Sequence, residues 1–257
     1  MAAAPLHEDD TGWYLYGVVA NGADPPPVAG VDPRDQVVVL AEGPVAGVAS
    51  RVLLSEFDEA ALVDRLADAE WLEQKIRAHE QVVEAALASG AVVPCRFCTV
   101  YRDESELRRF LSERGDALAE ALARVEGRVE LGVKAFAARP AAAGEASQAE
   151  SGRAYLEARR REQEARQELA RSHGEIAAQL HERLLAAAED GVVLALQSRD
   201  VSGRDAEVVF NGAYLVADRG RFEDALAAIS RERDDVGLEL TGPWPPYNFV
   251  SEELSRP

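Results

Sequence analysis

The stretch VELGVKAFA, residues 129–137, decides the fold of the second half of this 257-residue chain. Its apolar and β-branched residues predict a strand. The elements that follow it can be read from their periodicity and their flanking turn residues. They are a helix at about 153–189, strands at 192–198 and 206–217 with a turn at 200–205 between them, a helix at 219–237, and a strand at 238–244.

The second half therefore has the element order β-α-β-β-α-β. This order is that of the ferredoxin-like fold, a four-stranded antiparallel sheet with both helices on one face. The small and polar residues at 139–152 interrupt the pattern, and we expect a flexible segment there. We predict a ferredoxin-like C-terminal domain over residues 128–250.

The first half is predicted to be a separate α+β domain, residues 11–127. WYLYGVVA, residues 13–20, is the first strand, and a Pro/Gly/Asp-rich loop at 20–36 follows it. The remaining predicted elements are a hairpin of 37–41 and 45–50, a helix at 71–90, a strand candidate in VVPCRF, and two helices in 103–127 broken at Gly115. The fold class is therefore α+β with two domains.

Composition and charge limit the classes of partner. The net charge is −18, so phosphate backbones and anionic lipid would repel the chain, and we expect neither nucleic acid nor membrane as a partner. No apolar run reaches the length of a membrane helix, and the N-terminus does not resemble a signal peptide. We expect a cytoplasmic protein.

Both cysteines lie in VVPCRFCTVY, residues 92–101, with the spacing C-x-x-C at Cys95 and Cys98. That spacing suits a redox dithiol or half of a zinc site. The flanking β-branched residues instead favour a strand, on which residues three apart face opposite sides. Because no further histidine or cysteine completes a ligand set, the pattern favours two structural thiols and no metal site.

The remaining motifs propose no catalytic residue and no cofactor. No nucleophile-elbow, dinucleotide-binding or phosphate-loop pattern occurs. His79 lies on the apolar face of its helix, which favours a buried, hydrogen-bonded histidine over a ligand. His173 and His181 are too far apart on one helix to share an ion, and we expect both at a core margin.

The segment GPWPPYNFV, residues 242–250, is the most unusual of the chain. Its prolines exclude a regular helix or a central strand. Trp244, Tyr247 and Phe249 either pack a stiff tail onto the body of the protein or anchor a partner, since aromatic residues dominate interface hot spots. The residues alone leave both readings open, and these three are the candidate partner-binding residues.

Four stretches together resemble one family, the gas vesicle proteins of the GvpF/GvpL type. They are WYLYGVV, HEQVVEAALASGAVVPCRFCTVY, GRVELGVKAF, and NGAYLVA followed after one helix by LTGPWPPYNFV. The resemblance runs from Trp13 to Val250. Cys98 departs from it, because the family pattern usually has glycine there, so C-x-x-C is not a chemical motif of the family.

The resemblance implies a non-enzymatic accessory or structural protein of gas vesicle formation. Such a protein would contact the small apolar shell protein GvpA, and possibly other gas vesicle accessory proteins, and support nucleation or assembly of the shell. Two alternatives come from the residues. A ferredoxin-like domain could be a small-molecule-binding or regulatory module, and Cys95 with Cys98 could serve a thiol or zinc enzyme.

Overall fold

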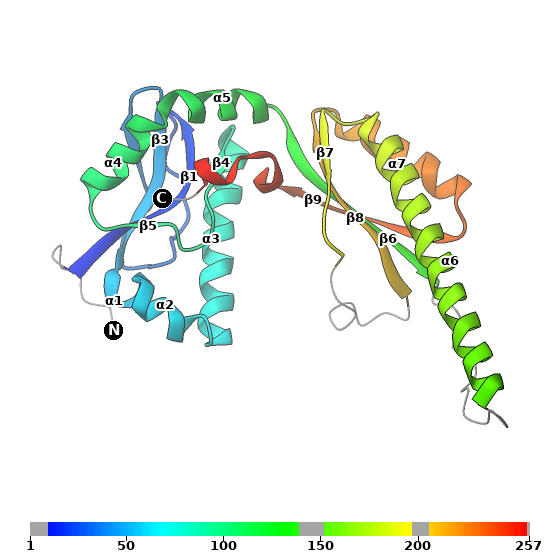
Figure 1. Cartoon of the computed structure of the whole chain (residues 1–257). Helices are drawn as coiled ribbons and strands as arrows, with labels where there is room; N and C mark the ends of the chain where they lie inside the picture. Colours follow the sequence, from blue (N-terminus) through cyan, green and yellow to red (C-terminus); the bar gives the residue numbers. More distant parts are fainter. Residues whose placement is uncertain (1–9, 139–151, 197–205, 256–257) are drawn as a thin grey trace. The chain divides into compact units, whose positions relative to one another are not determined.

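The computed structural model describes residues 10–138, 152–196 and 206–255 (Figure 1). The chain packs as two compact units. Unit 1 combines the residues up to Glu130 with those from Trp244 onward, and unit 2 runs from Leu131 to Pro243. The predicted flexible segment at 139–152 and the predicted turn at 200–205 lie outside the described residues, except for Gly152. Among the described residues, the helices are too short or too polar to cross a bilayer.

Unit 1 is built on a sheet with the order β2-β3-β1-β4, in which β5 also pairs with β1. The predicted hairpin is confirmed, since β2 and β3 pair antiparallel from Glu42 and Val45 outward. The strand candidate VVPCRF contributes only two residues, and a second two-residue strand follows the turn after it. The strands are β1 Thr11–Ala20, β2 Val38–Glu42, β3 Val45–Leu53, β4 Val93–Pro94 and β5 Val100–Tyr101.

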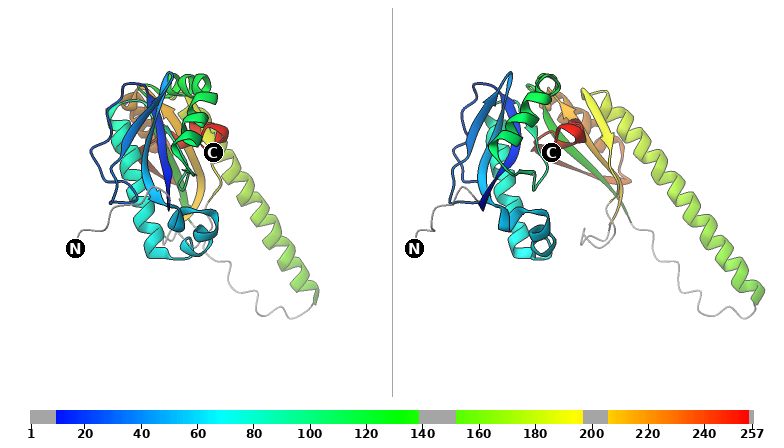
Figure 2. Two further views of the ribbon diagram at one scale, coloured as in Figure 1. Left: turned by 90° about the vertical axis from the view of Figure 1, so that its left-hand side faces the viewer. Right: turned by 60° about the vertical axis from the view of Figure 1, so that its left-hand side comes forward.

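Helices cover both faces of this sheet (Figure 2). Aspartates mark several of the helix starts: the side chains of Asp58, Asp68 and Asp103 accept hydrogen bonds from the first free backbone N–H groups. The predicted break at Gly115 is confirmed, and this glycine begins the second helix of the pair. The helices are α1 Leu54–Phe57, α2 Glu59–Arg65, α3 Ala69–Ser89, α4 Glu104–Glu113 and α5 Gly115–Val125.

A bulge in β1 changes which side chains of this strand face each of the two hydrophobic cores, one on either face of the sheet. The register against β3 shifts between Leu15 and Gly17, which leaves Tyr16 as the extra residue. Before the bulge, Tyr14 faces the core beneath α3 and Leu15 faces the core beneath α4 and α5. After it the alternation is reversed, so that Val18 faces α4 and α5.

Unit 2 contains a four-stranded antiparallel sheet with the order β7-β8-β6-β9. Both of its helices pack on one face, because the ring of Tyr214 in β8 contacts His181 of α6 and Phe222 of α7. Ile176, Leu180 and Leu184, which follow one another at intervals of four residues on α6, are buried. The elements are β6 Val129–Ala138, α6 Gly152–Leu185, β7 Asp190–Val193, β8 Ala206–Val216, α7 Arg219–Glu232 and β9 Val236–Trp244.

Three predicted elements of unit 2 have boundaries that were wrong by several residues. The helix predicted to end at about 189 ends at Leu185. The helix predicted to end at 237 ends at Glu232, because Arg233 is already extended and pairs with Asp235. The strand predicted at 192–198 begins at Asp190 and ends at Val193, although Leu194 still donates to the carbonyl of Asn211. Residues 197 and 198 lie outside the described residues.

The C-terminal segment differs from the predicted division. Residues up to 250 were assigned to the second domain, whereas the segment from Trp244 onward packs with unit 1. The reason is physical: this segment buries Phe249 and Leu254 in unit 1, and Tyr247 and Asn248 form hydrogen bonds with residues of the same unit. It also carries the three candidate partner-binding residues.

Candidate functional site

The segment Trp244–Ser255 lies on unit 1 and turns through two short 3-10 helices, Tyr247–Phe249 and Glu252–Leu254. Pro245 and Pro246 are buried, and Phe249 is 4% exposed. Leu254 enters the core beneath α4 and α5, where Val250 packs beside it. Proline restricts the backbone at two successive positions, so the segment is stiff before it reaches these anchors.

Tyr247 connects the segment to α3 through a buried histidine. Its hydroxyl donates to Glu80 Oε1 at 3.1 Å and lies 3.2 Å from His79 Nε2. His79 Nδ1 lies 3.0 Å from the hydroxyl of Tyr14, which in turn accepts from the Cys98 N–H at 2.9 Å. The expected buried, hydrogen-bonded His79 is confirmed, with an exposed fraction of 1%.

Burial sets the protonation of this network. It lowers the pKa of His79 to about 4, so the imidazole is neutral at pH 7. A neutral ring satisfies all contacts if Nε2 donates to Tyr247 and Nδ1 accepts from Tyr14. Burial also raises the pKa of Glu80, although the hydrogen bond from Tyr247 opposes this. The network therefore holds the segment in place without a buried ion pair.

A second clamp joins the segment to the first residues of β6. Glu130 is 6% exposed and accepts from the backbone N–H of Asn248 at 2.9 Å and from its side-chain amide at 2.6 Å. Burial raises the pKa of Glu130, and the two hydrogen bonds from Asn248 oppose the rise. Glu130 precedes unit 2 in the chain and Asn248 follows it, so the chain segments that enter and leave unit 2 are hydrogen-bonded to each other within unit 1.

The end of the segment covers the turn between β4 and β5. The Arg96 N–H donates to the Ser255 carbonyl at 3.1 Å, and the Arg96 guanidinium pairs with Glu252. Thr99 is 3% exposed, and its hydroxyl donates to the Arg96 carbonyl at 2.8 Å. Arg96 and Thr99 therefore shape this turn.

The two cysteines are free thiols on opposite sides of the sheet. Cys95 belongs to the core beneath α4 and α5, and Cys98 packs against the core beneath α3. Burial raises the pKa of each thiol to about 12, which disfavours the reactive thiolate. Cys98 has φ 65°, a left-handed conformation that glycine adopts without strain. The glycine expected from the resemblance thus has a backbone reason.

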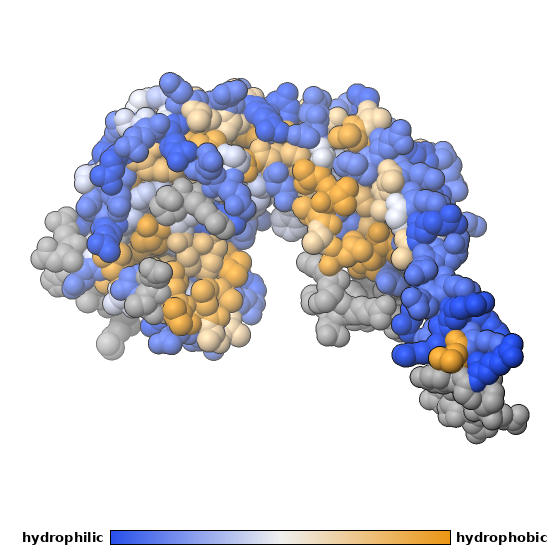
Figure 3. Space-filling model, viewed as in Figure 1, coloured by the Kyte–Doolittle hydropathy of each residue, from blue (hydrophilic) through white to orange (hydrophobic). Residues whose placement is uncertain are grey.

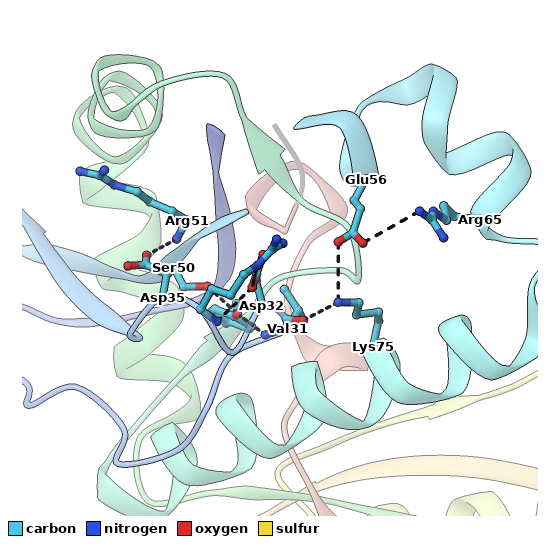
Figure 4. Close-up of polar contacts among 10 residues, drawn as sticks. Val31, Asp32, Asp35, Ser50, Arg51, Glu56, Arg65 and Lys75 are labelled. Carbon is cyan, nitrogen blue, oxygen red and sulfur yellow. Dashed lines mark hydrogen bonds and ion pairs between the residues drawn. The ribbon is translucent and has the colours of Figure 1, made fainter. Parts of the chain in front are cut away.

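The loop between β1 and β2 carries the densest polar network (Figure 4). The buried Lys75 donates to the Val31 carbonyl at 2.7 Å and faces Glu56 at 3.9 Å. Asp32 is 1% exposed. Burial alone would raise the pKa of Asp32, but the hydrogen bonds and charge of Arg34 outweigh it and hold the pKa below its usual value. These contacts order the loop.

Exposed apolar side chains mark two further surfaces (Figure 3). One lies on α2 and α3, where Val63 is 72% and Leu66 50% exposed. The other lies along β7 and the residues after it, where Val193 is 57% and Leu196 53% exposed. Sequence reasoning placed these residues in helices and strands and could not tell that they face solvent.

The three candidate residues have different environments. Phe249 is buried, Tyr247 is partly buried and hydrogen-bonded, and Trp244 is 45% exposed. Within the described part of the chain, no group of three histidine, cysteine or acidic residues is arranged to hold a metal ion. His173 and His181 are both partly buried. The hydrogen-bonded residues around His79 and Glu130 hold the C-terminal segment. The fold leaves several apolar side chains exposed, among them Val63, Leu66, Val193, Leu196 and Trp244.

Comparison with known proteins agrees along nearly the whole chain. The family model described as gas vesicle synthesis protein GvpL/GvpF matches residues 12–251. Gas vesicle protein L of a Streptomyces species is 37% identical, over 92% of this chain and 90% of that protein. Gas vesicle protein F2 of Halobacterium salinarum is 26% identical, over 92% and 91%.

The fold is also shared with solved structures. The crystal structure of GvpF from Anabaena matches with a TM-score of 0.67 at 18% identity, covering 94% of this chain and 96% of that one. The structure of GvpF from Microcystis aeruginosa matches with a TM-score of 0.64, covering 93% and 99%.

Proposed function

Because the chain belongs to the gas vesicle synthesis protein GvpL/GvpF family, we propose that it is a non-enzymatic accessory protein that binds the shell protein GvpA. In this role it supports nucleation or assembly of the gas vesicle in the cytoplasm. The observation that carries the proposal is exposed apolar surface on a strongly acidic chain. An apolar shell subunit would associate non-specifically if left free.

The charge of the chain supports a carrier role. A net charge of −18 keeps the carrier, and a complex that it forms, dispersed by mutual repulsion. The apolar surfaces would contact the shell subunit until it reaches a growing edge. Such contacts gain strength from removing apolar area from water, so salt should not weaken them.

Among the three candidate residues, we propose Trp244 as the one that meets the partner, since it is 45% exposed. Tyr247 and Phe249 are held by unit 1, so their role would be to fix the segment that presents Trp244. A preorganised aromatic side chain loses little freedom on binding, which is typical of an interface hot spot. The raised thiol pKa values of Cys95 and Cys98 support a role without thiol chemistry.

We also propose that unit 2 is a ferredoxin-like domain. Its element order β6-α6-β7-β8-α7-β9 and its sheet order support this assignment. We propose a domain boundary between residues 127 and 128, as the sequence predicts. The packing of Trp244–Ser255 supports a first domain that also includes the C-terminal segment, in place of a second domain that extends to residue 250.

The test is capture of GvpA, fused to a soluble carrier protein, by the full chain at low and high salt. We expect capture at both, and a roughly tenfold loss of affinity in Trp244→Ala. Leu156→Ala is the matched control, because Leu156 is also exposed, at 68%, but lies on α6. Failure of the unaltered chain to capture GvpA would remove the carrier function, and an unchanged Trp244→Ala would remove only the role of Trp244.

A further inference from the structure

The strand β7 lies at an edge of the second sheet. Among the described residues it pairs only with β8, from Asp190 opposite Leu215 to Val193 opposite Gly212. An edge strand presents one row of backbone N–H and C=O groups away from its sheet. This row is a template on which another extended segment can pair.

The hydrogen-bond pattern shows which groups face outward. The Leu194 N–H donates to the Asn211 carbonyl at 2.8 Å, so residue 194 points its backbone toward β8. In an antiparallel ladder the direction alternates from residue to residue. Gly191 and Val193 therefore direct their backbone groups away from β8, and of the two N–H groups that of Gly191 already donates to Asp190 Oδ1 at 2.8 Å.

Other strand edges of the protein carry a cover. At β2, Arg108 donates to the Ala41 carbonyl at 2.9 Å. Between β4 and β5, the Arg96 N–H is taken by Ser255. The strand β9, at the opposite edge of the second sheet, contains Pro243, a residue that blocks strand addition. Residues 190–196 contain no proline, no lysine and no arginine.

The side chains along the β7 edge are apolar and exposed. Val193 and Leu196 are more than half exposed, and Leu185 at the end of α6 is 38% exposed. Leu185 lies beside this strand, since a Cβ at Gly191 would meet its Cδ1 at 3.2 Å. Figure 3 shows hydrophobic surface over this part of unit 2. Backbone pairing and apolar contact are thus available on one edge.

The negative charge of the chain limits which kind of segment can bind at the β7 edge. Two copies of the chain would bring together two bodies of net charge −18, which disfavours self-pairing of β7. The edge itself begins at Glu189 and Asp190, so an acidic segment would also be repelled. An extended apolar segment that is uncharged or basic meets none of these penalties.

We propose that the β7 edge binds an extended, apolar, non-acidic segment of the shell protein as an added strand. The proposal rests on the function proposed above and assigns it a site. The N–H and C=O of Val193 and the carbonyl of Gly191 would supply the pairing, and the Val193 side chain would contact the alternate side chains of the segment.

The test uses Val193→Pro, which removes one outward N–H and leaves the β7–β8 ladder intact. Capture of the GvpA fusion by the full-length variant should fall at least tenfold. Val193→Thr keeps the N–H and the β-branched shape, and we expect a loss of two- to fivefold. Leu156→Ala on α6, at an exposed aliphatic residue outside both apolar surfaces, is the control and should bind as the unaltered chain does.

The outcomes separate the two proposals. If Val193→Pro is folded by circular dichroism and captures GvpA as well as the unaltered chain, the edge site is wrong and the carrier function stands. If Val193→Pro is unfolded, Val193→Lys decides in its place, because it keeps the backbone and puts a charge on the apolar edge. No capture by the unaltered chain would overturn both proposals.

Discussion

The two sheets of this protein treat their edges differently. In unit 1, Arg108 donates to a carbonyl of β2, and the C-terminal segment lies over the turn between β4 and β5. In unit 2, the described residues leave β7 at a sheet edge, where the backbone groups of Val193 point outward beside exposed valine and leucine side chains. Most large apolar side chains of the described residues are buried, so an exposed apolar strand edge at β7 is an exception. Such an exception indicates an interaction site. The edge of β7 is therefore a surface that packing among the described residues leaves open.

The largest expected effect on stability comes from weakening the packing of the C-terminal segment, Trp244–Ser255, on unit 1. Phe249→Ala should cost about 3 kcal/mol of unfolding free energy, because it opens a cavity under a residue that is 4% exposed. Trp244→Ala, five residues earlier, should change stability by about 0.5 kcal/mol or less. Urea unfolding followed by circular dichroism compares them. Equal costs for the two would contradict the division between anchor and presented side chain.

Low pH should also destabilise the packing of the C-terminal segment, because His79 becomes protonated. The pKa of this histidine is about 4 in the folded chain against an ordinary value of 6.5. Between these values the unfolded chain binds the proton and the folded chain does not, so stability falls as pH drops from about 6.5 to 4. The full loss is about 3 kcal/mol.

Two carboxyl groups oppose this trend. Glu80 and Glu130 have raised pKa values, so their protonation in the folded chain regains stability at low pH. The histidine contribution is therefore measured as a difference, by denaturant unfolding of the unaltered chain and His79→Gln between pH 7 and 4. Parallel profiles for the two chains would show that His79 does not titrate as the geometry requires.

The two thiols should respond in opposite directions. Cys95→Ala should destabilise the protein by about 1 kcal/mol, because it leaves a small cavity in the core. Cys98→Gly should raise stability by about 0.5 kcal/mol, since relief of the left-handed conformation outweighs the flexibility that glycine adds to the unfolded chain. Thermal unfolding with a reductant present measures both. A stabilised Cys95→Ala or a strongly destabilised Cys98→Gly would be inconsistent with these environments.

Sequence reasoning predicted most of the elements of both units, because hydrophobic period and turn residues act locally. It also predicted a buried His79, since the helical period placed that residue on an apolar face. It could not predict that Tyr247 hydrogen-bonds His79 or that Asn248 meets Glu130, because these residues lie more than one hundred positions apart. The division of Trp244, Tyr247 and Phe249 into one exposed and two packed residues depends on the same long-range contacts.

The position of β7 at a sheet edge could not be predicted from the sequence, because it also depends on long-range contacts. VVLALQS has the composition of a buried strand, and only the sheet order places it at an edge. Composition reports that a residue can be buried, whereas the order of strands decides whether a neighbour exists. The cover on β2 was equally hidden, because Arg108 reaches a carbonyl 67 positions away.

The smallest expected effect concerns that arginine. Arg108→Ala bares the Ala41 carbonyl and removes the pairs with Glu104 and Glu42, at a cost of about 0.5 kcal/mol in stability. Its informative consequence is association: with β2 uncovered, sedimentation velocity should show a small concentration-dependent rise in mass. Arg77→Ala also removes one positive charge and one ion pair, from a site on α3, and is the matched control. If both variants sediment alike, Arg108 does not protect the edge of β2 from association. The difference between the covered edges of unit 1 and the open edge of β7 would then rest on the C-terminal segment alone.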